Sequence, residues 1–169
     1  SISGLALYGF TDNGGAAIQV GGGVTDVNIS NNLIGLRENG RANRNENGII
    51  VKDAASLTID GNVIGRSSET GILVQPTQID GTTDLTITNN MIGTNITRRN
   101  YRNKNAIILD GTGSNGGTSG VAVDDTFYIS GTNIIQDNMI AYSRSGSGIN
   151  VRGATDVDII DNTITLNGI

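Results

Sequence analysis

The 169-residue sequence contains no cysteine, no histidine and no tryptophan, and its one proline is Pro76. Without cysteine there are no disulfides, catalytic thiols or thiolate metal sites. Without histidine there is no imidazole to serve as acid, base or metal ligand. No apolar run approaches the roughly 20 residues that a bilayer-spanning helix needs, so we expect no membrane span.

Positive charge is scarce as well. The chain has 11 Lys and Arg against 16 Asp and Glu, which gives a net charge of −5 and argues against general nucleic-acid binding. Glycine is abundant at 25 residues, and asparagine, threonine and β-branched residues are common. This composition favours many short strands that are joined by tight turns.

Internal repeats are the strongest signal in the sequence. Five segments each carry two isoleucines five residues apart: Ile29/Ile34, Ile59/Ile64, Ile87/Ile92, Ile135/Ile140 and Ile159/Ile164. An asparagine lies between the two isoleucines at the same offset every time: Asn32, Asn62, Asn90, Asn138 and Asn162. A second motif alternates with these segments, at Ala17–Val20, Gly48–Val51, Gly71–Val74, Ala106–Leu109 and Gly148–Val151.

These repeats predict an all-β, right-handed parallel β-helix of about five to six coils with three short strands per coil. The Gly-Ile-x-Val motif is the first strand, the segment before the asparagine is the second, and the short Leu-Ile or Met-Ile after it is the third. We expect the isoleucines to form inner columns. We expect the asparagines to form an outer ladder, because Asn tolerates the left-handed backbone region of a tight turn. A leucine-rich repeat would need a fixed period of 20–29 residues, whereas the ladder asparagines are 30, 28, 48 and 24 residues apart.

The chain is expected to be one segment, 1–169, with loop insertions at 36–47, 94–105 and 110–132. Neither end resembles the polar cap that a solenoid needs, so we expect a fragment of a longer solenoid. The middle residues of three consecutive first strands, Ile50, Leu73 and Ile108, predict an outward apolar row. Either the 110–132 loop covers this row, or three such rods pack there as a homotrimer.

The repeats resemble those of the right-handed parallel β-helix superfamily, which includes pectate lyases, polygalacturonases, alginate epimerases and phage tailspikes. The unit that starts with Asn90-Met-Ile-Gly-Thr-Asn and ends at Asn105-Ala-Ile-Ile-Leu109 is similar to repeats of large bacterial surface and secreted β-helix proteins. Its counterpart from Asn32 to Val51 keeps the same spacing of 15 residues from Ile34 to Ile49. The resemblance implies an extracellular or cell-surface location, or a phage virion, with neighbouring coils of a longer chain or a homotrimer as partners.

Positive charge is concentrated on one edge of the predicted solenoid. Nine of the 11 Lys and Arg fall on the turns from third to first strand: Arg37, Arg41, Arg44, Arg66, Arg98, Arg99, Arg102, Lys104 and Arg144. Stacking would align them into a basic stripe suited to an anionic polysaccharide, since guanidinium forks match carboxylates. Tyr101 and Tyr142 lie on the same edge and are candidate sugar contacts. The alternative is that these exposed loops carry charge for solubility.

Acidic residues raise an alternative function, that of a polysaccharide lyase or glycosidase. Glycoside hydrolysis needs two carboxyl groups roughly 5 to 10 Å apart. The candidates on outward or loop positions are Asp60, Asp80, Asp84, Asp110, Asp124, Asp125 and Asp158, and they form no motif that identifies catalytic residues. Asp124 and Asp125 are a candidate Ca²⁺ site, although a solvated loop pair is favoured. We therefore predict a non-catalytic, adhesin-like or tailspike-like segment. No cofactor is expected, and Ca²⁺ is the one alternative.

Overall fold

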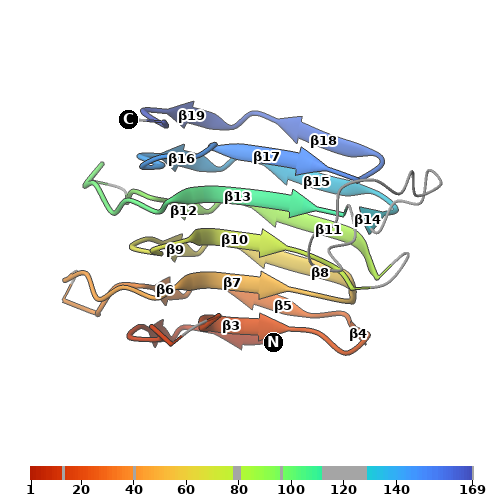
Figure 1. The fold of residues 1–169 in the computed structure, drawn as a ribbon, viewed down its shortest axis with the longest axis horizontal. Helices are drawn as coiled ribbons and strands as arrows, with labels where there is room; N and C mark the ends of the chain where they lie inside the picture. Colours follow the sequence, from red (N-terminus) through yellow and green to blue (C-terminus); the bar gives the residue numbers. More distant parts are fainter. Residues whose placement is uncertain (13, 40, 78–80, 96, 112–128, 169) are drawn as a thin grey trace, which may run out of the picture.

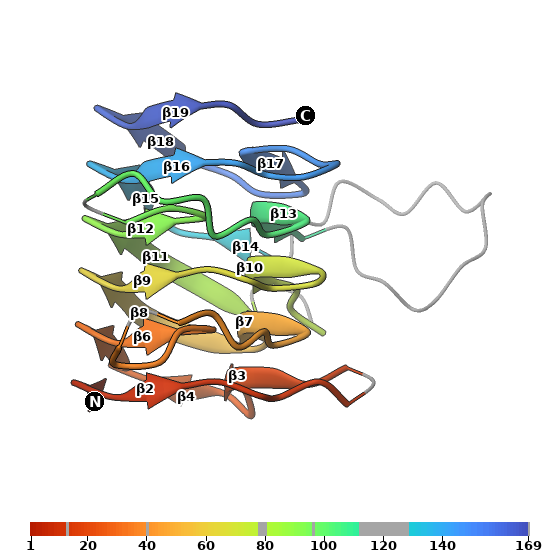
Figure 2. The same cartoon turned by 90° about the vertical axis from the view of Figure 1, so that its left-hand side faces the viewer.

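The computed structural model describes residues 1–12, 14–39, 41–77, 81–95, 97–111 and 129–168. Within these ranges the regular structure consists of the 19 strands β1 to β19. They form three sheets of parallel strands, and in each sheet the strands of successive coils stack along one axis (Figure 1, Figure 2). The chain visits the three sheets in turn and pairs each strand with the equivalent strand of the next coil. The predicted all-β parallel β-helix is confirmed.

The strands define six coils, numbered from the N-terminus. Each coil starts with its second strand and ends with its first strand, and the sixth coil contributes to two sheets. The first-strand sheet contains β3 (Ala16–Val20), β7 (Asn47–Val51), β10 (Thr70–Val74), β13 (Asn105–Asp110) and β17 (Ile149–Arg152). The second-strand sheet contains β1 (Ile2–Ser3), β5 (Asn28–Ser30), β8 (Ala54–Asp60), β11 (Thr82–Thr88), β15 (Asn133–Gln136) and β18 (Val157–Ile160), with β4 (Val24–Thr25) beside β8 and β14 (Ile129–Ser130) beside β11. The third-strand sheet contains β2 (Ala6–Leu7), β6 (Leu33–Ile34), β9 (Val63–Ile64), β12 (Met91–Ile92), β16 (Met139–Ala141) and β19 (Thr163–Thr165).

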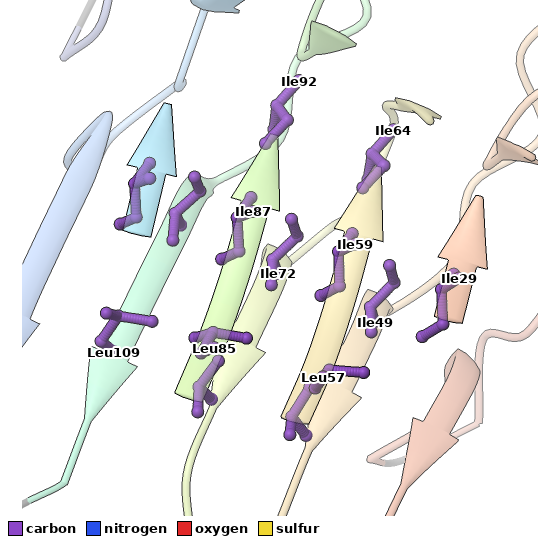
Figure 3. Packing of buried hydrophobic residues seen from close by; sticks show 14 of the residues in the cluster. Ile29, Ile49, Leu57, Ile59, Ile64, Ile72, Leu85, Ile87, Ile92 and Leu109 are labelled. Atoms are coloured by element: carbon purple, nitrogen blue, oxygen red, sulfur yellow. The ribbon is translucent and has the colours of Figure 1, made fainter. Parts of the chain in front are cut away.

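The isoleucine pairs form the expected inner columns (Figure 3). Strand register places Ile29, Ile59, Ile87, Ile135 and Ile159 in one column and Ile34, Ile64, Ile92, Ile140 and Ile164 in the other. In coils 2 to 5 all eight side chains are fully buried. Each contributes about 1.5 to 3 kcal/mol of hydrophobic stabilisation, and only the stack of coils provides this burial.

The ladder asparagines lie inside the solenoid, so the expectation of an outer ladder is wrong. Asn32, Asn62, Asn90 and Asn138 are each at most 1% exposed. The backbone N and the Nδ2 of Asn62 both donate to Oδ1 of Asn90, at 2.9 and 3.0 Å. The tight turn directs peptide groups toward an interior without water, and the side-chain amides satisfy those groups.

The left-handed backbone conformation falls one residue earlier than expected. Asn31, Asn89 and Asp137 have φ of 55°, 54° and 55°, and Gly61 has φ of 63°. The ladder asparagines that follow them are not in this region. The turn therefore divides two roles between adjacent residues: the first bends the backbone, and the second provides the internal hydrogen bonds.

The predicted outward row on the first-strand sheet has the expected register but less exposure than expected. Ile50 pairs with Leu73, and Leu73 pairs with Ile108. Ile50 is only 8% exposed, and the other two side chains are half-buried. Residues 112–128 lie outside the described residues, so cover by the 110–132 loop stays a prediction.

Candidate functional site

The turns that lead from the third to the first strand stack on a buried polar column, which we call the inner turn column. Its members in coils 2 to 6 are Asn45, Ser67, Asn103, Ser143 and Asn167, of which the first four are at most 2% exposed and the last is half-buried. Backbone hydrogen bonds set this register: Ser68 N donates to Asn45 O at 3.0 Å, Lys104 N to Ser67 O at 3.2 Å, and Arg144 N to Asn103 O at 2.8 Å. Each asparagine also caps the coil before it, as when Ser67 N donates to Asn103 Oδ1 at 2.8 Å.

The inner turn column was not predicted from the sequence. Its asparagines alternate with serines, so no residue type recurs in every coil as it does in the first ladder. A partial signal was present: Asn45 and Asn103 both lie three residues before the small residue that opens a first-strand motif. The buried Oγ atoms of Ser67 and Ser143 have no hydrogen-bond partner among the described residues.

Long and short turns alternate along this edge. Loops 36–43 in coil 2 and 94–101 in coil 4 are long, and Figure 1 shows both projecting at the same edge. Each loop closes on its own start, since Asn43 N donates to Gly35 O at 2.9 Å and Tyr101 N donates to Gly93 O at 2.8 Å. The short turn of coil 3 lies between them. The 15-residue spacing from Ile34 to Ile49, which recurs in the unit from Asn90 to Leu109, therefore belongs to coils 2 and 4 and not to consecutive coils.

A glycine is required where each long loop starts. Gly35 and Gly93 have φ of 78° and 77°, in the region that side-chain-bearing residues avoid. A Cβ atom at Gly93 would also overlap the carbonyl oxygen of Ala141 in the next coil. The glycine thus lets the chain leave the third-strand sheet while the coils remain closely stacked.

A groove of about 870 Å³ follows this edge across coils 2 to 5, and we call it the basic groove. Five cations line it: Arg44, Arg66, Arg102, Lys104 and Arg144. The other lining residues are small or polar: Ala42, Asn43, Ser67, Ser68, Asn100 and Asn103. None of the described lining residues is acidic.

Most of the cations in the basic groove have no acidic partner in the part of the chain that the structure describes. Lys104 Nζ lies 2.6 Å from Glu69 Oε2, and both side chains remain more than 40% exposed. The other ion pair among the described residues joins Arg152 to Asp110, at 2.7 Å. The exposed side chains of Arg44, Arg66, Arg102 and Arg144 therefore form no ion pair with any described carboxylate.

Several residues of the predicted basic stripe lie outside the groove. The Arg37 guanidinium lies 5.3 Å from the centroid of the Tyr8 ring, a cation–π contact. Arg41, Arg98 and Arg99 are exposed on the long loops and do not line the groove. Tyr101 is only 5% exposed, so little of its ring is available to a sugar. Its backbone and Cβ instead lie where a side chain at residue 65 would be, and this explains the glycine there.

The structure gathers none of the described candidate acids at the groove. Oδ1 of Asp60 accepts hydrogen bonds from Thr88 Oγ1 at 2.9 Å and Asn89 Nδ2 at 2.8 Å. Asp84 Oδ1 accepts from the backbone N of Thr132 at 3.0 Å, Asp110 is paired with Arg152, and Asp158 is exposed on β18. The described residues include no group of three or more acidic, His or Cys side chains suited to a metal ion. Asp80 and the candidate Ca²⁺ pair, Asp124 and Asp125, lie outside the described residues.

No family model, no curated protein and no solved structure matches the chain. The part of the chain that the structure describes offers no membrane-spanning helix. The parallel β-helix therefore rests on strand register, and any functional argument rests on the basic groove.

Proposed function

We propose that this chain is a non-catalytic segment of an extracellular or cell-surface protein, in which the basic groove binds an anionic polysaccharide. The observation that carries the proposal is the lining of the groove, in which the described residues include five cations and no acid. Four of the five cations are arginines, whose planar forks bind carboxylates bidentately. Acidic polysaccharides occur largely outside cells, which is the reason for the proposed location.

The electrostatics of the chain support an anionic ligand. The net charge is −5, yet cations of consecutive coils gather in one groove. Neighbouring coils are about 4.8 Å apart. At that separation two unit positive charges in water repel each other by roughly 1 kcal/mol. An anion in the groove relieves this repulsion, and a local positive field accelerates the arrival of such a ligand.

The uncharged lining residues favour a sugar over a simple ion. Asn43 and Asn100 present amide groups, which both donate and accept hydrogen bonds, and Ser68 presents a hydroxyl. Such groups suit the many hydroxyls of a polysaccharide. We also propose a relationship to the pectate-lyase-like superfamily, in an adhesin-like or tailspike-like protein. The plan of three strands per coil, with a tight asparagine turn between the second and third, supports this relationship.

A glycan array with a matched pair of triple variants tests the proposed function. The groove variant is Arg44/Arg66/Arg102→Ala. The control is Arg41/Arg98/Arg99→Ala, which removes three exposed arginines of the same edge that do not line the groove. Both change the net charge from −5 to −8 (−5 − 3), so they differ only in where the charge is lost.

We expect the wild type and the control to bind acidic glycans, and the groove variant to lose this binding. The signal should also fall between 0.1 and 1 M salt, because the screening length shortens from about 10 to 3 Å. Equal signals from the wild type and the groove variant would contradict the proposal. So would equal losses in both variants, or a preference for duplex DNA over acidic glycans.

A further inference from the structure

We infer that the polysaccharide lies parallel to the solenoid axis, across coils 2 to 5, with one acidic group at each coil. This inference deepens the proposed function and rests on it. It concerns the direction of the bound chain and the spacing of its charges, which the presence of a basic groove does not determine by itself.

The arginines of coils 2 to 4 share one register. Arg44, Arg66 and Arg102 immediately precede Asn45, Ser67 and Asn103 of the inner turn column. Because the backbone hydrogen bonds of this column hold its members in register, the three arginines occupy the same position in coils 2, 3 and 4. One cation therefore recurs at each coil step of about 4.8 Å.

The row of charges continues into coil 5 with a small shift. Tyr142 takes the position before the column there, and the cation is Arg144, immediately after Ser143. Arg144 still lines the same groove as the other three arginines. In coil 4 the position after the column holds Lys104, which forms an ion pair with Glu69. Each of coils 2 to 5 thus supplies one arginine without a described ion-pair partner.

The direction of the groove agrees with this row of charges. Its lining comes from four consecutive coils, so its length follows the solenoid axis. Three coil steps span about 14 Å. The ends of the two long loops, at Asn43 and Asn100, line the groove as well. A ligand that ran across the axis would meet the arginines of one or two coils only.

The coil spacing selects the ligand chemistry. A step of about 4.8 Å is close to the length of one sugar unit in an extended polysaccharide. A polymer with an acidic group on every sugar can therefore place one anion at each arginine. A polymer whose acidic and neutral sugars alternate presents an anion at every second arginine only.

Isothermal titration calorimetry with oligogalacturonates of one to six units tests this spacing. We expect the affinity to rise about two- to fivefold with each added unit, the range that exposed ion pairs contribute, and to level off at four units. Hyaluronan oligosaccharides carry a carboxylate on alternate sugars. With four carboxylates they should bind about four- to 25-fold more weakly than the four-unit oligogalacturonate, because two of the four contacts are lost.

Single substitutions then test the order of the contacts. Arg144→Ala removes the terminal cation of the row, and the plateau should move from four units to three. Arg99→Ala is the control, because this exposed residue does not line the groove, and its plateau should stay at four. Circular dichroism of each variant serves as the control for an intact fold.

The outcomes separate the two proposals. If no acidic oligosaccharide or polysaccharide binds, the proposed function and the inference both fail. If oligogalacturonates bind without any dependence on length, or if hyaluronan oligosaccharides bind equally well, the inference fails while the proposed function stands. An unchanged plateau in Arg144→Ala would also overturn the inference.

Discussion

Replacing one internal ladder asparagine, Asn90→Ala, tests how the coils are joined. The Oδ1 of Asn90 accepts two hydrogen bonds from Asn62, and its Nδ2 donates to Ile59 O at 2.8 Å and to Asn138 Oδ1 at 3.1 Å. The side chain is 1% exposed, so water cannot replace these bonds. At about 1 kcal/mol for each of the four bonds, the substitution should lower the free energy of unfolding by about 4 kcal/mol.

The loss is large relative to the stability of a typical domain, which is about 5 to 15 kcal/mol. For a chain of this length it corresponds to a fall in Tm of about 8 to 16 °C. The assay is urea unfolding followed by far-ultraviolet circular dichroism, because the chain has no tryptophan to report by fluorescence. Coincident transitions by tyrosine fluorescence would support a two-state treatment.

Asn162→Ala is the matched control. Its side chain also makes four hydrogen bonds, two accepted from Asn138 and two donated to Ile135 O and Ile160 O. Asn162 is in the sixth coil and is only partly buried, so water can replace its partners. We expect a loss of about 1 to 2 kcal/mol there. Equal losses at the two positions, or a loss below about 1 kcal/mol for Asn90→Ala, would refute the argument from burial.

The remaining predictions concern the turn edge. Gly93→Ala should lower the free energy of unfolding by several kcal/mol more than Gly22→Ala, as measured by thermal melts. The two glycines share a φ of 77° to 78°, but only at Gly93 would an added Cβ overlap the next coil. Equal losses would contradict this close approach. Ser67→Ala should leave the Tm unchanged or slightly raised, because its buried hydroxyl has no partner among the described residues. Asn103→Ala loses two hydrogen bonds and should lower the free energy of unfolding by about 2 kcal/mol, and similar losses in the two variants would contradict this. Glu69→Gln should raise the affinity for oligogalacturonate about twofold in calorimetry, since it removes the one described acid that pairs with a groove cation. A weaker affinity would argue against the groove as the binding site.

Much of the fold could be predicted because the repeats record it directly. A strand position that points into the core must be apolar, so paired isoleucines five residues apart recur on the second and third strands of each coil. The strand register confirms both isoleucine columns. The direction of the asparagine side chains was predicted wrongly, because the same residue type suits an exposed bend and a buried hydrogen-bonding position equally well.

The candidate site was only partly predictable. Counting charges by turn identified the basic edge, and five of its nine cations line the basic groove. Counting by turn did not separate Arg66 and Arg102 from Arg98 and Arg99, because all four lie on the same set of turns. It also suggested Tyr101 as a sugar contact, whereas the side chain is buried where the chain folds back over Gly65.

The sequence by itself determined that this chain forms a parallel β-helix and which edge carries positive charge. Both properties depend on the composition of each coil, which is local. Only the tertiary structure decided which cations meet. Arg44, Arg66 and Arg102 are 22 and 36 residues apart along the chain, and loops of different length intervene. The three become neighbours because the buried inner turn column holds successive turns in register, and that register depends on contacts between coils.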